Sequence, residues 1–205
     1  MFITICMGWQ ETFEKIASEL MKNPTHDFEH AKRVCSISVK LAREEKADEE
    51  VVVAAALLHD VGYSVDEGKH EEKSLEIAGA LLEMTDFPRN KKERVIECIR
   101  HHRFSKGGEA ASLEAKILQD ADRIDAIGAV GIARCFLWSG EHKKALEEAV
   151  KHFSEKLLKL KDEMNTESGR RMAEERHRFM LEFLQKLESE REITPQTSST
   201  DPFYG

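Results

Sequence analysis

The chain of 205 residues is poor in the two residues that break regular structure, with four prolines and eleven glycines. Its apolar side chains recur every three or four positions, and they do not alternate along the chain as they would in half-buried strands. Both features predict helices. We therefore expect an all-α fold, a helical bundle.

Cysteine is also scarce, and none of the four cysteines stands in a Cys-x-x-Cys pair. A thiolate zinc cluster and a dithiol redox motif are both excluded by this spacing. We expect buried free thiols instead. The cysteines are Cys6, Cys35, Cys98 and Cys135.

A membrane segment is not predicted either. The opening residues, MFITICM, are apolar but lack a basic leader and a cleavage site of small residues. They are also much shorter than the ~20 residues that a membrane-spanning helix needs. We expect a cytoplasmic protein without a membrane partner.

There is no excess of basic residues, because 31 Lys and Arg stand against 39 Asp and Glu and leave a net charge of −8. This balance disfavours proteins that bind nucleic acid through a basic face. A local pocket for a small phosphorylated ligand remains possible. The length suits one domain, which we expect over residues 1–190, followed by a disordered tail over residues 191–205.

Two predicted helices are apolar on most faces and should be central. The first covers residues 51–58 and ends in His59 and Asp60, and the second, over residues 113–138, carries Asp120, Asp122 and Asp125. Buried carboxylates need a cationic partner or a metal ion. Imidazole together with carboxylate suits divalent manganese, iron, cobalt, nickel or zinc.

Helix geometry separates the three aspartates of the second helix. Asp122 and Asp125 are three residues apart and share a face, whereas Asp120 points roughly the opposite way. Only one of Asp120 and Asp122 is therefore expected to bind a metal. Structural salt bridges are the alternative that these residues leave open, with Lys116, Arg123 and Arg134 as the available cations.

Three segments carry a resemblance to a known family. They are HAKRV from His30, LLHDVG from Leu57 and DADRI from Asp120. Their order and helical placement resemble the H…HD…D signature of the HD-domain metal-dependent phosphohydrolase superfamily, in particular a small bacterial and archaeal branch. The resemblance is strongest over residues 24–140 and extends to about Leu187.

The resemblance implies a helical bundle around a metal site and, position by position, a set of ligands. It carries the metal-ligand role to His30, His59, Asp60 and Asp122. Asp60 and Asp125 are the implied catalytic carboxylates, with Asp125 expected to orient water or contact a sugar hydroxyl. The implied cofactor is a divalent transition metal, with room for a second metal such as magnesium.

Further polar residues are candidates to line the site. Relatives with larger sites place extra histidines where this chain has His70, His101 and His102, which makes these residues candidates for substrate or second-metal binding. The candidates for holding phosphate are Arg33, Lys69, Lys73, Arg103 and Lys106. A second HD dipeptide, at His26 and Asp27, precedes the apolar stripe of its helix and is interpreted as a helix-start pair.

These features predict a metal-dependent phosphohydrolase that acts on a phosphate ester or anhydride, most plausibly in a nucleotide. An example is the cleavage of a nucleoside triphosphate to the monophosphate and pyrophosphate by water that the metal activates. Some nucleotidase relatives have a glutamate shortly after the doublet, where this chain has Val61, Gly62 and Tyr63. A di-iron oxygenase and a non-catalytic, nucleotide-binding regulatory module are the alternatives. A homodimer is compatible with the sequence.

Overall fold

The computed structural model of the chain describes residues 8–23, 26–102 and 110–191. All regular secondary structure in these ranges is helical, apart from one isolated β-bridge between Lys22 and Asp27. The all-α prediction is confirmed. The elements are α1 (Trp9–Leu20), α2 (Phe28–Glu45), α3 (Glu49–Leu58), η1 (Glu67–Lys69), α4 (His70–Met84), η2 (Arg89–Lys91), α5 (Lys92–Arg100), α6 (Leu113–Asp125), α7 (Gly128–Glu141), α8 (Leu146–Glu155), η4 (Leu157–Glu163) and α9 (Glu167–Arg191).

Some expectations fall outside these ranges. Cys6, Arg103, Lys106 and the tail over residues 192–205 are not among the described residues. The one-domain organisation and the homodimer also stay predictions. Within the described part of the chain, no helix has both the length and the hydropathy that crossing a membrane requires.

The first helix expected to be central and the first half of the second, α6, are central. Asp48 caps α3 by accepting hydrogen bonds from the backbone N–H groups of Glu50 and Val51, and every residue from 51 to 58 except Val53 is buried. In α6, Ser112 is the capping residue, and most of the helix is likewise buried. Burial of an apolar surface on all sides fixes both helices inside the bundle.

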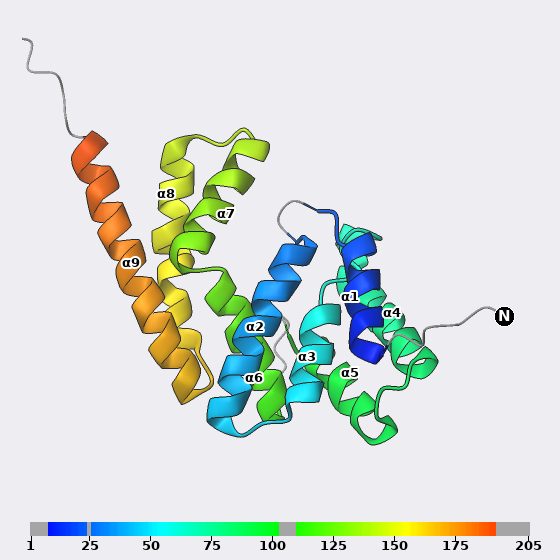
Figure 1. The fold of residues 1–205 in the computed structure, drawn as a ribbon. Helices are drawn as coiled ribbons and strands as arrows, with labels where there is room; N and C mark the ends of the chain where they lie inside the picture. The colour runs from blue at the N-terminus through cyan, green and yellow to red at the C-terminus, as the bar shows by residue number, and fades with distance from the viewer. Residues whose placement is uncertain (1–7, 24–25, 103–109, 192–205) are drawn as a thin grey trace, which may run out of the picture.

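The helices fall into two groups around this centre. In Figure 1, α2, α3 and α6 stand in the middle, with α1, α4 and α5 on one side and α7, α8 and α9 on the other. We call α1 to α6 the N-terminal helix group, and α7, α8, η4 and α9 the C-terminal helix group. Contacts of α9 with α2 and α6 join the two.

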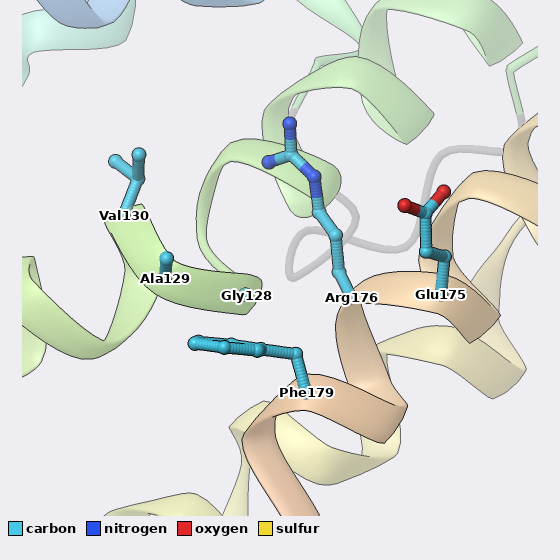
Figure 2. Close-up of a pocket in the computed structure, with 6 residues that line it drawn as sticks. All are labelled: Gly128, Ala129, Val130, Glu175, Arg176 and Phe179. Atoms are coloured by element: carbon cyan, nitrogen blue, oxygen red, sulfur yellow. The ribbon is translucent and has the colours of Figure 1, made fainter. Parts of the chain in front are cut away.

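The prediction of one long helix over residues 113–138 was wrong. The chain leaves the helix at Ala126, becomes extended at Ile127, and starts α7 at Gly128 with a φ of 77°. A glycine accepts this left-handed conformation without a steric penalty. The side chain of Arg176 from α9 closes the break by donating a hydrogen bond of 2.6 Å to the carbonyl oxygen of Ile124. Figure 2 shows Arg176 beside Gly128.

The chain after α7 is also interrupted at two points. Lys143 has a positive φ of 54° after the end of α7, and the backbone at Lys156 leaves the helical region between α8 and η4. Neither position is a proline or a glycine, so the local sequence carries no sign of the interruption. These two interruptions, at Lys143 and Lys156, separate α7, α8 and η4 into shorter helices.

The turn after α3 is packed tightly against α4. The backbone N–H of Gly62 donates a hydrogen bond of 3.0 Å to the hydroxyl of Ser74. A Cβ atom at Gly62 would collide with the carbonyl oxygen of His70 and the backbone nitrogen of Ser74. The absence of a side chain at this position lets the first turn of α4, with His70, lie against the turn that carries Asp60.

The cysteines in the described residues are free thiols, as predicted. Cys98 is buried, and burial raises the pKa of its thiol to about 12. Cys35 and Cys135 are only half-buried, so the expectation of burial holds for Cys98 alone. Burial also raises the pKa of the Cys35 thiol, to about 11. These groups are protonated at neutral pH and are poor nucleophiles.

Candidate metal centre

His59 and Asp60 emerge where α3 ends. The ring of His59 is fully buried, and its Nδ1 lies 2.8 Å from the carbonyl oxygen of Ala56, one turn earlier. This contact directs Nε2 toward Asp60, whose Oδ2 lies 3.5 Å away. Burial lowers the pKa of His59, which keeps the ring neutral, as a metal ligand must be.

His30 reaches the same point from the first turn of α2. Asp27 caps this helix and accepts a hydrogen bond of 2.7 Å from the backbone N–H of His30. The ring of His30 is buried, and its Nε2 lies 3.8 Å from Oδ2 of Asp60 and 3.5 Å from Oδ1 of Asp122. One ligand atom each of His30, His59 and Asp122 lies within 4.8 Å of the others.

The structure therefore brings together the four residues to which the resemblance carried the ligand role. They come from three helices of the N-terminal helix group, and Asp122 on α6 keeps about a third of its side chain exposed. The other three are buried. The exposed edge at Asp122 leaves the site open on one side.

The chemistry of the ring nitrogens fits a metal ion. Among the described residues, the buried Nε2 atoms without a hydrogen-bond partner include those of His30, His59, His70 and His102. In each ring, Nδ1 lies within 2.8 Å of an oxygen atom that can accept its proton. A ring that donates from Nδ1 presents a lone pair at Nε2, the usual arrangement of a metal-binding histidine.

The donor set also limits which metal suits it. Imidazole nitrogen with carboxylate oxygen favours divalent manganese, iron, cobalt, nickel or zinc, whereas magnesium and calcium prefer oxygen ligands. Burying unpartnered imidazole nitrogens costs free energy unless something binds them. A divalent transition metal held by these residues removes that cost.

His102 contacts this site, whereas among the described residues His101 has no hydrogen bond or ion pair with the proposed ligands. The ring of His102 is buried after the end of α5, with its Nε2 3.5 Å from Oδ1 of Asp60. His101 is half-buried, and its carbonyl oxygen accepts a hydrogen bond from the side chain of Gln119. Of the adjacent pair, His102 is the one that the fold brings to Asp60.

His70 is buried near the same turn. Its Nδ1 lies 2.7 Å from the carbonyl oxygen of Glu67, and its ring lies 4.8 Å from the ring of Tyr63 between centroids. Tyr63 in turn stacks on the ring of His26 at 4.0 Å. His70 is thus linked to the metal centre through aromatic contacts.

Sequence reasoning missed the part that His26 plays. Asp27 starts the helix as interpreted, but Nδ1 of His26 lies 2.7 Å from Oδ2 of Asp60. His26, His30 and Asp60 form a second group whose ligand atoms lie within 4.8 Å of one another. His26 precedes the capping residue Asp27 and lies outside α2, so no helical spacing in the sequence signals its contact with Asp60.

Asp60 is consequently surrounded by imidazole rings. Burial by itself would raise the pKa of this carboxyl, but His59, His102 and His26 reverse the effect and hold the pKa well below its usual range. Asp60 is therefore an ionised carboxylate in a buried position, which is the form that binds a cation.

Asp125 lies in a different place from the one expected of a group that orients water. Its carboxylate is fully buried behind His30 and accepts from Nδ1 of that ring at 2.8 Å. Arg33 donates to it from Nε at 2.7 Å, and Arg134 donates at 2.6 Å. Burial raises the pKa of Asp125, but the hydrogen bonds of His30 and Arg33 outweigh it and lower the pKa far below its ordinary value.

These contacts make Asp125 a positioning residue for His30. They also change the prediction for Arg33, whose guanidinium is engaged by Asp125 and was expected to hold phosphate. Lys73 pairs with Glu76 on the surface of α4, and Lys69 is exposed in η1. The structure does not bring these three cations together at the metal centre.

Asp120 faces away from the site, as helix geometry predicted. Its two oxygens accept hydrogen bonds of 2.8 Å from the backbone N–H groups of Asn165 and Thr166, and one of 2.7 Å from the hydroxyl of Thr166. This carboxylate anchors the start of α9 to α6. The two acidic residues of the DAD segment therefore have different partners on opposite faces of one helix.

The contact between Asp125 and His30 leads to a prediction about metal affinity. Asp125→Asn removes the charge that holds Nδ1–H of His30, so we expect binding of manganese to weaken by ~10–100-fold, the usual cost of losing such a partner. Calorimetric titration of metal-stripped protein measures this change. Asp162→Asn, the same substitution at an acid that is 75% exposed, is the control. Equal affinity of the Asp125→Asn variant and the wild type would contradict the positioning role.

A cavity of about 630 Å³ opens beside the metal centre. His26, His102 and Asp122 of the candidate site are among its lining residues, and its charged lining residues also include Arg123, Arg134, Lys156 and Glu163. The cavity then continues between the two helix groups, along α7, α8 and η4. The open side of the metal centre therefore faces a space that is large enough for a small molecule.

A second pocket, of about 290 Å³, lies between α7 and α9 (Figure 2). Its lining consists of Gly128, Ala129, Val130, Glu175, Arg176 and Phe179. It contains no histidine and only one carboxylate, so it lacks a set of metal ligands. The chemistry is concentrated in the larger cavity.

The fold and the ligand residues define the class of helical, metal-dependent hydrolases. A sequence model of the HD domain matches residues 27–127, a range that contains His30, His59, Asp60 and Asp122. The chain belongs to the HD-domain superfamily, as the resemblance of its motifs predicted.

Similar proteins share most of the chain. YpgQ of Bacillus subtilis strain 168 is 41% identical over 175 residues, which cover 80% of this chain and 84% of YpgQ. The crystal structure of YpgQ in complex with ADP matches with a TM-score of 0.77 and 34% identity, over 92% of this chain and 96% of that one. An HD-superfamily hydrolase from Bacillus thuringiensis matches with a TM-score of 0.71 and 33% identity, over 91% of this chain and 100% of the other.

Proposed function

We propose that the protein is a metal-dependent phosphohydrolase that acts on a nucleotide, for example a nucleoside triphosphate cleaved to the monophosphate and pyrophosphate. The observation that carries the proposal is a cluster of buried imidazole nitrogens without a hydrogen-bond partner. They lie beside carboxylates at the edge of a large cavity. The complex of the related YpgQ with ADP supports a nucleotide as the ligand.

His30, His59, Asp60 and Asp122 are the residues that would hold the metal. A divalent metal bound by such residues lowers the pKa of water and polarises a phosphoryl oxygen. Manganese, iron, cobalt, nickel and zinc all suit the donor set. The extra imidazoles of His26, His70 and His102 leave room for a second ion, such as magnesium, or for direct contact with phosphate.

The other residues of the site hold the proposed metal ligands in place. Asp125 holds the ring of His30, and Arg134, which lines the cavity, donates to Asp125 at 2.6 Å and so supports the same carboxylate. In the proposed reaction a water oxygen forms a new bond to phosphorus, and the bond from phosphorus to the bridging oxygen breaks. The proton that the water loses passes to solvent at the open side of the site, because the low pKa of Asp60 makes its carboxylate a poor proton acceptor.

A panel of substrates tests this proposal. Metal-stripped protein is resupplied with manganese, cobalt, nickel, magnesium or zinc, and the release of phosphate and of pyrophosphate is measured with nucleoside triphosphates, ADP and a generic phosphodiester. We expect release that depends on the metal. Silence of every substrate with every metal would overturn the proposal, and oxygen consumption by the iron-loaded protein would then test the oxygenase alternative.

We also propose that the protein is cytoplasmic. Nucleoside triphosphates are abundant in that compartment, so the location agrees with the proposed substrate. Fractionation of cells that express the protein tests the location independently of the activity.

A further inference from the structure

In the described part of the chain, four imidazole rings surround Asp60, and the ring of His26 contacts the carboxylate in a different way from the others. Nδ1 of His26 lies 2.7 Å from Oδ2 of Asp60. The other three rings face the carboxylate with Nε2, at 3.5 Å for His59 and His102 and at 3.8 Å for His30. Of the four, His26 has by far the shortest contact, at an ordinary hydrogen-bond distance.

The positions of the ring protons explain this difference. In His30, His59 and His102, Nδ1 lies within 2.8 Å of a carboxylate or carbonyl oxygen that accepts its proton. Nε2 of each of these rings then carries a lone pair, which suits a metal ion and cannot donate to a carboxylate. His26 is therefore the ring that supplies a proton to the ionised carboxylate of Asp60.

Tyr63 fixes the plane of the His26 ring. The two rings stack with their centroids 4.0 Å apart and an angle of 17° between their planes. Tyr63 stands in the same turn as Asp60, because its backbone N–H donates to the carbonyl oxygen of Asp60 at 3.0 Å. Its hydroxyl donates to Glu67 at 3.2 Å. One turn thus carries both the carboxylate and the aromatic surface that orients the ring bonded to it.

The segment before α2 is tied to this turn by backbone contacts as well. The backbone N–H of Lys22 donates to the hydroxyl of Ser64 at 3.1 Å, and the isolated bridge joins Lys22 to Asp27. These contacts keep the segment that carries His26 beside the turn that carries Asp60. The bond between the two side chains therefore joins parts of the backbone that are already held together.

His26 reaches the carboxylate from the wall of the cavity. His26 and Tyr63 line the cavity, whereas Asp60 is 4% exposed and is not among the lining residues. A carboxylate that binds a metal needs a fixed orientation, and a hydrogen bond from a neighbouring residue is the usual means of fixing it. The contact from Nδ1 of His26 has the geometry of such a bond.

From these contacts we propose that His26 is a positioning residue for Asp60 and that Tyr63 holds His26 in place by stacking. The bond from Nδ1 fixes the orientation in which the carboxylate faces His30 and His59, so that Asp60 is arranged for the metal before the metal binds. The proposal rests on the proposed function, because that function makes Asp60 a metal ligand. In this role His26 acts through Asp60 and is not itself a ligand.

Two amide substitutions at His26 separate the two nitrogens of its ring. The side-chain nitrogen of asparagine is as many bonds from Cα as Nδ1 of histidine, and that of glutamine is as many bonds away as Nε2. Metal-stripped protein is titrated with manganese by calorimetry, without nucleotide. We expect His26→Ala and His26→Gln to bind manganese ~10–100-fold more weakly than the wild type, and His26→Asn to restore most of the affinity.

Three results of this titration would overturn the proposal. Wild-type affinity in His26→Ala would show that the bond to Asp60 does not matter for the metal. Rescue by His26→Gln, without rescue by His26→Asn, would show that Nε2 is the nitrogen that acts. Equal loss in all three variants would show that the metal needs the imidazole itself as a ligand.

His142→Ala is the matched control, because it also removes a ring with an Nδ1 hydrogen bond and an aromatic stack. His142 is exposed at the end of α7, with Nδ1 2.8 Å from the carbonyl oxygen of Trp138 and its ring stacked on the indole at 4.1 Å. Its affinity for manganese should equal that of the wild type. Circular dichroism of each metal-stripped variant checks that the fold is kept.

Visible absorption of the cobalt-loaded protein tests the part of Tyr63. The bands report the geometry of the ligands around cobalt, which a loss of stability alone does not change. Tyr63→Phe keeps the stacked ring and should keep the wild-type bands, whereas Tyr63→Leu removes the ring and should shift the bands toward those of His26→Ala. Wild-type bands in Tyr63→Leu would remove Tyr63 from the proposal, and wild-type bands in His26→Ala would refute the positioning role.

Metal binding and hydrolysis decide the two proposals separately. If nucleotides are hydrolysed but His26→Ala binds manganese as tightly as the wild type, the positioning role fails and the proposed function stands. If His26→Ala binds manganese weakly and His26→Asn restores the affinity, but no nucleotide is hydrolysed, the positioning role stands and the proposed reaction fails.

Discussion

Replacing Asp122 with alanine is expected to abolish metal-dependent hydrolysis and to leave the fold intact. The carboxylate lies 3.5 Å from Nε2 of His30 and is partly exposed at the open edge of the site. Losing a group that only supports a ligand costs ~10–100-fold in affinity or activity, so loss of a ligand itself should exceed ~100-fold. Hydrolysis and bound metal are measured on the same sample.

Circular dichroism of the metal-stripped Asp122→Ala variant is the control for folding. Its helical signal and its thermal transition should match those of the metal-stripped wild type, because among the described residues the carboxylate contacts another element only through the ring of His30, at 3.5 Å. A folded variant that lacks metal but retains full activity would show that the ligand assignment is wrong.

Replacing Asp120 with alanine should have the opposite profile, a large loss of stability. The buried carboxylate accepts hydrogen bonds from the backbones of Asn165 and Thr166 and from the side chains of both. Without it, these donors are buried and unpaired, each at a cost of ~1–3 kcal/mol. We expect the free energy of unfolding to fall by about 3 kcal/mol or more, as measured by urea titration.

Asp122→Ala is the matched control for this measurement, since it removes the same group two residues along the same helix. The metal-stripped Asp122→Ala variant should unfold at the urea concentration of the metal-stripped wild type. Equal stability of the two variants would contradict the assignment of Asp120 to the anchoring of α9.

The central helices could be predicted because burial on all sides leaves an unmistakable apolar run. Residues 51–58 contain no charged side chain, and the helix over them is buried as expected. The break at Ile127 could not be predicted in the same way. It depends on Arg176, which comes from α9 and bonds to the carbonyl oxygen of Ile124 across about fifty residues of chain.

The candidate site, too, could be predicted only in part. Helical spacing and the resemblance were enough to select His30, His59, Asp60 and Asp122, because each stands at a fixed position in its helix. The contact of His26 with Asp60 joins residues 34 positions apart, and part of the cavity is lined by α7, α8 and η4, whose boundaries the sequence did not reveal. Asp125 was placed on the correct face of α6, but burial of its carboxylate behind His30 depends on how α2 and α6 pack.

The interruption at Ile127 also separates two segments of the chain that contribute different residues to the cavity. The HD domain match ends at this residue, and α7, α8 and η4, which line part of the cavity, come after it. The matched segment thus contains the four proposed metal ligands, while the later segment builds the rest of the cavity wall. Because Arg134 of α7 donates to Asp125, which in turn holds His30, the later segment also supports the candidate metal centre.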